Sequence, residues 1–128
     1  MSLALGSLVF GLWSCGSVRP PLSASTDVYE TPLVGSCEPG DPLRVVRYEQ
    51  DGRRLFLEVE HGGGCEQHTY VACLDDPHPD GEQVYELSIH HEARGDRCEA
   101  ELIRVLRIEL DRDLRVRTRR ADGVTLVE

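Results

Sequence analysis

Histidine, cysteine and carboxylate side chains gather at the two ends of the stretch from residue 61 to residue 99. Two strand-like runs lie between them, at 67–74 and 83–91, and the second alternates apolar and polar residues, as a half-buried strand does. If these runs pair as antiparallel strands, His68 opens one and His91 closes the other, so the two imidazoles lie close together. Asp96 follows in the next loop. Two imidazoles and a carboxylate can hold Zn²⁺ with one coordination position open, so His68, His91 and Asp96 form a candidate zinc site.

A structural interpretation of these residues stays open beside the zinc site. His68 and His91 can hydrogen-bond Asp96, a neighbouring carboxylate or loop backbone and so fix the turn, because buried imidazoles need such partners. If the thiols were reduced, Cys65 and Cys98 would join the two histidines in a Cys₂His₂ set. Export to an oxidising compartment would favour a disulfide between the two cysteines instead.

The composition indicates one folded domain and argues against several classes of function. The chain has 128 residues, 40% of them hydrophobic, and a net charge of −9. An acidic protein is a poor partner for nucleic acid, because phosphate binding requires clustered cations. The glycines at 62–64 lack the Lys-Ser/Thr of a phosphate loop and predict a tight bend or β-bulge. No Gly-x-Ser-x-Gly elbow is present, and we expect a protein that is not an enzyme and needs no cofactor unless it binds zinc.

The amino terminus predicts an exported, lipid-anchored protein. Residues 3–12 are apolar or small, a run that is too short to span a bilayer and is typical of a signal peptide. Leu12-Trp13-Ser14-Cys15 resembles the lipobox of bacterial lipoproteins, which implies a signal peptide over residues 1–14 and acylation of Cys15, for example with palmitate. Trp13 departs from the usual small residue, and no basic residue precedes the apolar run, so either the start codon lies upstream or the signal is weak. By the same resemblance, Gly16 implies the outer membrane.

With Cys15 acylated, four cysteines remain for disulfides. An antiparallel meander of the strands at 54–60, 67–74 and 83–91 would bring Cys65 and Cys98 to the same edge, so we expect this pair. By elimination Cys37 pairs with Cys73, although the meander places these two at opposite edges and the segment after Cys37 would have to cross the sheet.

The rest of the chain divides into a tether and a β-domain. Residues 15–42 are rich in proline and serine and predict an extended, mobile tether. Residues 43–128 carry period-2 patterns and turn signals, including Asp51-Gly52, which predicts a type I′ hairpin. For residues 102–110 we favour a strand over a helix, since β-branched residues are dense there. We therefore expect an all-β fold: a small antiparallel β-sandwich or partly open barrel of six to seven short strands, stapled by disulfides.

A pattern within this domain resembles that of small exported lipoproteins frequent in myxobacteria and their relatives. It consists of Gly63-Gly64-Cys65 with His68 and Tyr70, then His91-Glu92 with Asp96 and Cys98-Glu99, and finally residues 106–111. The resemblance implies compartment and fold, and no activity. The function we expect is a cell-envelope lipoprotein with a non-enzymatic binding or structural β-domain, in contact with the membrane through Cys15 and with a protein or small-molecule partner that the sequence does not specify. The alternative is a zinc-binding exported protein.

Overall fold

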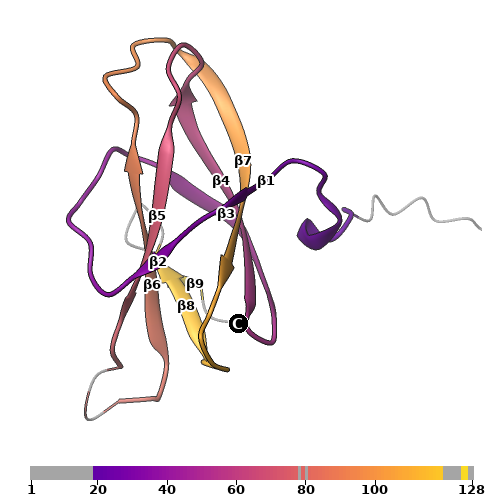
Figure 1. Ribbon diagram of the computed structural model, residues 1–128, viewed down its shortest axis with the longest axis vertical. Helices are drawn as coiled ribbons and strands as arrows, with labels where there is room; N and C mark the ends of the chain where they lie inside the picture. Colours follow the sequence, from indigo (N-terminus) through magenta and orange to yellow (C-terminus); the bar gives the residue numbers. More distant parts are fainter. Residues whose placement is uncertain (1–18, 78, 80, 120–124, 127–128) are drawn as a thin grey trace, which may run out of the picture.

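The computed structural model describes residues 19–77, 79, 81–119 and 125–126, and these residues form almost entirely β-structure (Figure 1). Cys15 and the expected signal peptide at 1–14 lie outside the described residues. Among the residues that the structure describes, no helix is long and apolar enough to cross a membrane. In chain order the elements are η1 (Leu22–Ala24), β1 (Val28–Glu30), β2 (Leu33–Val34), β3 (Arg44–Asp51), β4 (Arg54–Gly63), β5 (Thr69–Asp75), β6 (Tyr85–Glu92), β7 (Ala100–Glu109), β8 (Val116–Arg119) and β9 (Thr125–Leu126).

The strands form two sheets that pack on one another as a β-sandwich. The first has the order β1-β7-β4-β3 and the second the order β2-β5-β6-β8-β9. The expected all-β sandwich is confirmed, with more strands than the six to seven predicted. Three strand pairs, β1 with β7, β2 with β5 and β6 with β8, are parallel, so both sheets are mixed where the sequence predicted antiparallel pairing throughout.

Alternation along the strands places the core between the sheets. Leu55, Leu57 and Val59 of β4 all point inward and are fully buried. Leu106 and Ile108 of β7 pack beside them, because β4 and β7 pair along their whole length. The run at 102–110 is therefore a strand, as predicted, and its alternation fits a sheet that buries one face.

The predicted β3–β4 hairpin is present with a shifted turn. Asp51 pairs with Arg54, so the two loop residues are Gly52 and Arg53 and not Asp51 and Gly52. Of the two, Gly52 alone has a positive φ, at 57°. This is the pattern of a type II′ turn, in which the first loop residue is glycine, and not of the type I′ turn that was expected.

The meander expected for residues 54–91 is wrong, although the disulfide that it suggested is present. β4 and β5 belong to different sheets, and the chain crosses between them at residues 64–68. Cys65 lies just beyond the pair of Gly63 with Ala100 that ends the β4–β7 ladder, and Cys98 lies just before it. The Cys65–Cys98 bond, with 5.8 Å between the Cα atoms, therefore closes the end of this ladder.

The second disulfide, Cys37–Cys73, needs no segment to cross a sheet. β2 runs parallel to β5 with Val34 opposite Cys73, so Cys37 comes to β5 from the strand beside it. The two Cα atoms are 5.7 Å apart. β2 could not be predicted from the sequence, since two residues in a proline-containing segment carry no periodicity.

The segment predicted as a tether lies against the domain from Pro20 onward. Leu22 is 4% exposed, and its backbone N–H donates to the Glu49 carboxylate at 2.7 Å and 2.8 Å. The Arg47 guanidinium donates to the Pro20 carbonyl at 2.7 Å. These contacts cover part of the outer face of the first sheet, since Glu58 and Ile103 line the pocket beneath η1.

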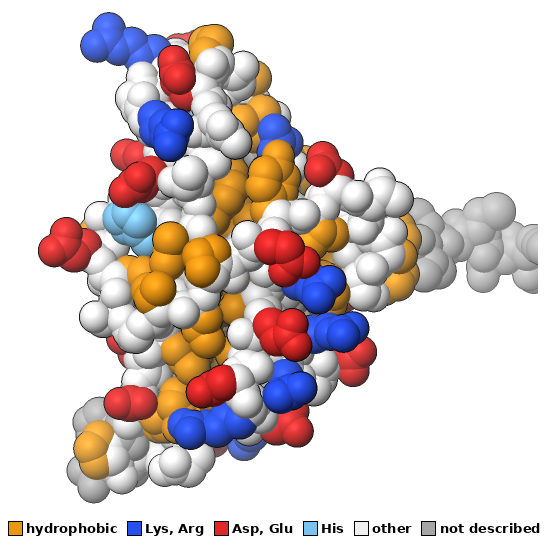
Figure 2. All heavy atoms as spheres, in the orientation of Figure 1, with side chains coloured by type: hydrophobic (Ala, Val, Ile, Leu, Met, Phe, Trp, Pro, Cys, Tyr) orange, Lys and Arg blue, Asp and Glu red, His pale blue; other side chains and the backbone are white. Residues whose placement is uncertain are grey.

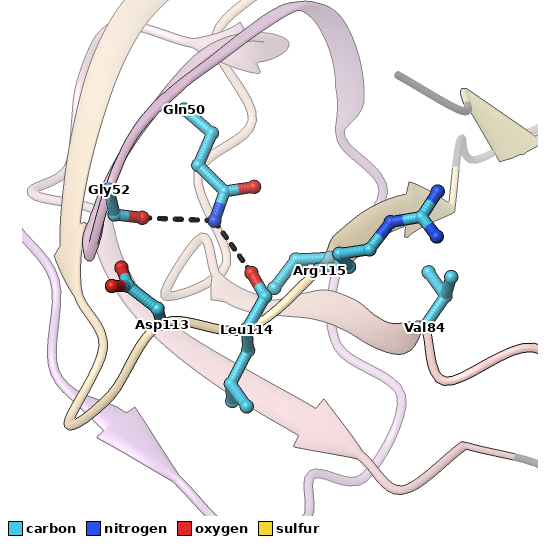
Figure 3. A pocket seen from close by; sticks show the side chains of 7 residues that line it. Gln50, Gly52, Val84, Asp113, Leu114 and Arg115 are labelled. Carbon is cyan, nitrogen blue, oxygen red and sulfur yellow. Dashed lines mark hydrogen bonds between the residues drawn. The ribbon is translucent and has the colours of Figure 1, made fainter.

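At the hairpin end of the sandwich, Gln50 ties the two sheets together (Figure 3). Its side-chain nitrogen donates to the carbonyls of Gly52 at 3.0 Å and Leu114 at 2.7 Å. The Tyr48 hydroxyl donates to Gln50 Oε1 at 2.9 Å and lies 3.4 Å from the Val116 carbonyl on the same side. Edge strand β3 is thus fastened to β8, and the sandwich is partly closed along this edge.

Replacing Cys37 and Cys73 together with serine should lower the free energy of unfolding by roughly 3–4 kcal/mol, the loop-closure entropy of a bond with a sequence separation of 36. Urea denaturation followed by circular dichroism measures the change. Ser36→Ala, beside the bond, is the control and should differ little from the parent protein. A double variant as stable as the parent would contradict a stapling role for this bond.

Candidate functional site

A cluster of aromatic side chains with polar tips lies between the sheets at the end opposite the β3–β4 hairpin. His61 comes from the end of β4, Tyr70 from β5 and His91 from the end of β6, while His68 directly precedes β5. His61 is 7% exposed and His91 1% exposed. The ring centroid of His61 is 4.6 Å from that of His68 and 4.2 Å from that of His91. Two strands of one sheet and one of the other thus hold the cluster.

The Asp96 carboxylate organises the loops that close this end. Its Oδ2 atom accepts hydrogen bonds from the backbone N–H groups of Gly64, Cys65 and Glu66 at 3.0, 3.1 and 3.0 Å, and from His68 Nε2 at 2.8 Å. Its Oδ1 atom accepts from the Cys98 N–H at 3.0 Å, and the Asp96 side chain is 0% exposed. The His68 hydrogen bond, followed by those of the backbone amides, holds the pKa of the carboxyl well below its usual range, so Asp96 is charged.

Gly63 allows this packing because it has no side chain. A Cβ atom there would stand 2.5 Å from His68 Nε2 and 2.8 Å from Asp96 Oδ2. The φ of Gly63 is 147°, in the region that favours glycine. Gly63 therefore serves a close approach of backbone to side chains, in keeping with the bend that the sequence predicted.

His68 and His91 meet edge to edge. His68 Nδ1 is 2.7 Å from His91 Nε2, and the rings are nearly coplanar at 17° with centroids 4.9 Å apart. On their outer sides, His68 Nε2 faces the Asp96 carboxylate and His91 Nδ1 faces the Pro42 carbonyl at 3.2 Å. Both outer partners only accept hydrogen bonds, so both outer nitrogens carry a hydrogen. The inner contact then brings the two remaining lone pairs together, an arrangement that a metal ion between them would make favourable.

His61 and Tyr70 form a second polar contact in the cluster. The Tyr70 hydroxyl hydrogen-bonds His61 Nε2, and His61 Nδ1 hydrogen-bonds the Gly62 carbonyl at 2.9 Å. Burial raises the pKa of Tyr70 to about 12, so its hydroxyl is protonated and donates. Burial also lowers the pKa values of His61 and His91. Together with its acceptor on Nδ1, this makes His61 a neutral imidazole with its Nε2 lone pair toward Tyr70.

The structure brings together all three residues of the candidate zinc site, His68, His91 and Asp96. Their hydrogen bonds are those of the structural interpretation that the sequence left open. The sequence reasoning missed His61, which continues the inward alternation of Leu55, Leu57 and Val59 on β4. The signal was present, since a histidine two residues beyond an inward valine shares its face.

No family model and no curated protein matches the chain. Among solved structures, the chain is similar to the crystal structure of a NigD-like immunity protein from Bacteroides caccae, with a TM-score of 0.57 and 17% sequence identity. The match covers 80% of this chain and 59% of that chain, so this chain spans less than two thirds of its neighbour. At this identity the likeness shows a shared fold.

Gly63→Ala should destabilise the protein by roughly 1–3 kcal/mol, because the methyl group collides with His68 and Asp96 in a backbone conformation that disfavours it. Thermal unfolding compares it with Gly62→Ala, the matched control, whose added Cβ meets nothing closer than 4.0 Å. Equal melting temperatures for the two variants would contradict the close packing at Gly63.

Acidification from about pH 7.5 to about pH 5.5 should lower the melting temperature. Burial lowers the pKa values of His61 and His91 below the ordinary 6.5, so the unfolded chain binds more protons in this window. The free energy of unfolding therefore decreases as the pH decreases. His90 acts in the opposite direction, because its hydrogen bond to the Glu38 carbonyl raises its pKa. The drop should be smaller in His61→Phe. A melting temperature that rises on acidification would refute the burial of neutral histidines.

Proposed function

We propose that the protein is a lipid-anchored protein of the bacterial cell envelope whose β-sandwich binds a partner and performs no catalysis. The observation that carries the proposal is the lipobox-like Leu12-Trp13-Ser14-Cys15, followed by a domain whose other four cysteines form two disulfides. Disulfides persist in oxidising compartments outside the cytosol. The proposal includes both a binding partner and the membrane that holds the lipid anchor, which we take to be the outer membrane.

The geometry of the polar cluster supports a role without catalysis. The side chains of His68 and Asp96 are 4% and 0% exposed, and their hydrogen bonds engage them with one another and with loop backbone. A general acid or base must come within hydrogen-bond reach of its substrate. The similarity to a protein described as an immunity protein agrees with a small domain that acts by binding.

The face shown in Figure 2 offers a surface on which a partner could rest. Apolar side chains gather along its centre, over β1 and β2, and acidic and basic side chains alternate around them. Tyr29 of β1 is 37% exposed and Val34 of β2 42% exposed. Contiguous apolar patches exposed on a surface are typical of interaction sites.

A short link would hold the domain close to the membrane. The Pro20 carbonyl accepts a hydrogen bond from Arg47 of the domain, and Pro20 follows Cys15 by only five residues. A fully extended chain of that length spans roughly 18 Å. The outer face of the first sheet, to which this segment is fastened, would then stand near the lipid surface.

The test is metabolic labelling with a fatty acid of the full chain in a Gram-negative host. Wild-type protein should incorporate the label and partition into detergent, while Cys15→Ser should lose the label and be released in soluble form. Trp13→Ala is the matched control: it restores the small residue usual in a lipobox and should keep the label. Wild-type protein found soluble with the residues before Cys15 intact would contradict the proposal.

A further inference from the structure

We propose that His61, His68 and His91 form a binding site for a divalent transition-metal ion of the kind that prefers imidazole ligands, such as Zn²⁺. This site goes beyond the envelope role and does not depend on lipidation. One ring nitrogen from each histidine lies within 4.8 Å of one from each of the other two. The ligands are His61 Nε2, His68 Nδ1 and His91 Nε2.

The first support is the hydrogen bond on the outer nitrogen of each ring. His68 Nε2 faces the Asp96 carboxylate, His91 Nδ1 the Pro42 carbonyl and His61 Nδ1 the Gly62 carbonyl. Metal-binding histidines characteristically donate their second N–H to a carboxylate or a backbone carbonyl, which fixes the tautomer and the ring orientation. All three histidines have this arrangement, and it leaves the lone pairs of the three inner nitrogens for an ion.

The second support is the contact between His68 Nδ1 and His91 Nε2, where two lone pairs face one another. The two nitrogens are 2.7 Å apart. Zinc–nitrogen bonds of 2.0–2.1 Å in a tetrahedral site require roughly 3.3 Å between ligand nitrogens, so the rings must separate by roughly half an ångström. His68 lies in the crossing between the sheets and not in a strand, and is placed to make that movement. His61 exchanges its hydrogen bond with Tyr70 for the ion.

The charges around the cluster support a cation. The Asp96 carboxylate is hydrogen-bonded directly to one proposed ligand and offsets part of the ionic charge. Arg104 opposes the ion; it lines the pocket of about 160 Å³ that reaches His68 and Tyr70 from the surface, together with Glu66.

The proposed ligands differ from the set that the sequence suggested. Asp96 already accepts five hydrogen bonds, four from backbone amides and one from His68. Direct coordination by Asp96 would break several of these. His61 therefore takes its place as the third ligand, and Asp96 orients His68.

Isothermal titration of purified, disulfide-bonded wild-type protein with zinc chloride tests the site, and the visible absorption of added Co²⁺ reports tetrahedral coordination. One zinc ion per chain should bind with a dissociation constant of about 1 µM or lower, a range that is measurable by this method. His61→Phe keeps a ring in the stack without the nitrogen and should weaken binding by at least about 100-fold. Asp96→Asn changes the hydrogen-bond partner of His68 Nε2 and should weaken zinc binding by about 10–100-fold.

His90→Ala is the matched control, because His90 neighbours His91 on β6 but points to the opposite face, where it contacts Glu38 and Glu92. It should bind zinc as the wild type does. Circular dichroism and non-reducing peptide mapping establish that each variant keeps its fold and both disulfides. No binding by the wild type at about 100 µM zinc, unchanged affinity in His61→Phe, or loss of binding in His90→Ala would each overturn the site.

Discussion

The end of the sandwich that carries the histidine cluster depends on one buried carboxylate. Asp96 accepts hydrogen bonds from the N–H groups of residues 64, 65, 66 and 98 and from His68, and none of its side chain is exposed. A buried charge is very costly unless hydrogen bonds replace its hydration. Hydrogen bonds to an ionised group are about twice as strong as neutral ones. Residues 64–68 have no strand partner, and their irregular backbone is therefore held in place by hydrogen bonds to Asp96.

Three features of the sequence serve this one interaction. Gly63 leaves the space into which His68 and Asp96 fit. Arg94 and Gly95, both with positive φ, turn the chain after β6 so that Asp96 can face the loop opposite. The Cys65–Cys98 bond joins the same two loops covalently and reduces the entropy that the unfolded chain would gain by separating them. The cysteines and the carboxylate therefore stabilise the same junction by different means.

The histidines extend this junction into the space between the sheets. His61 and His91 occupy inward positions at the ends of β4 and β6, where the core would otherwise continue with residues such as Leu57 and Leu87. A polar cluster in such a position is stabilising only if its groups are satisfied. Here the backbone carbonyls of Gly62 and Pro42 and the Asp96 carboxylate satisfy the outer nitrogens. The strands that bury the cluster hold the nitrogens of His61 and His91 in position, while His68 lies in the crossing between the sheets.

Local sequence patterns predicted the parts of the fold that depend on residues near one another in the chain. The inward residues of β4 follow from an alternation that Phe56 interrupts, and the neighbourhood of His68, His91 and Asp96 follows from their positions at the ends of two paired strands. The pairing of β4 with β7 in place of β5 could not be predicted, because the choice of partner depends on packing between distant segments and leaves no mark on periodicity. The same holds for β1 and β2, whose two or three residues are strands only because β7 and β5 lie beside them. His61 was missed because it stands one position beyond the run read as a strand, next to three glycines.

The measurement that tests the central role of Asp96 most directly is hydrogen exchange at the backbone amides of Gly64, Cys65 and Glu66, resolved by nuclear magnetic resonance. These amides lie outside every described strand, so only their bonds to Asp96 would protect them. They should exchange as slowly as amides inside the β4–β7 ladder, and Asp96→Asn should accelerate them while the ladder stays protected. Exchange of these three amides in the wild type at the rate of an unstructured peptide would contradict the central role of Asp96.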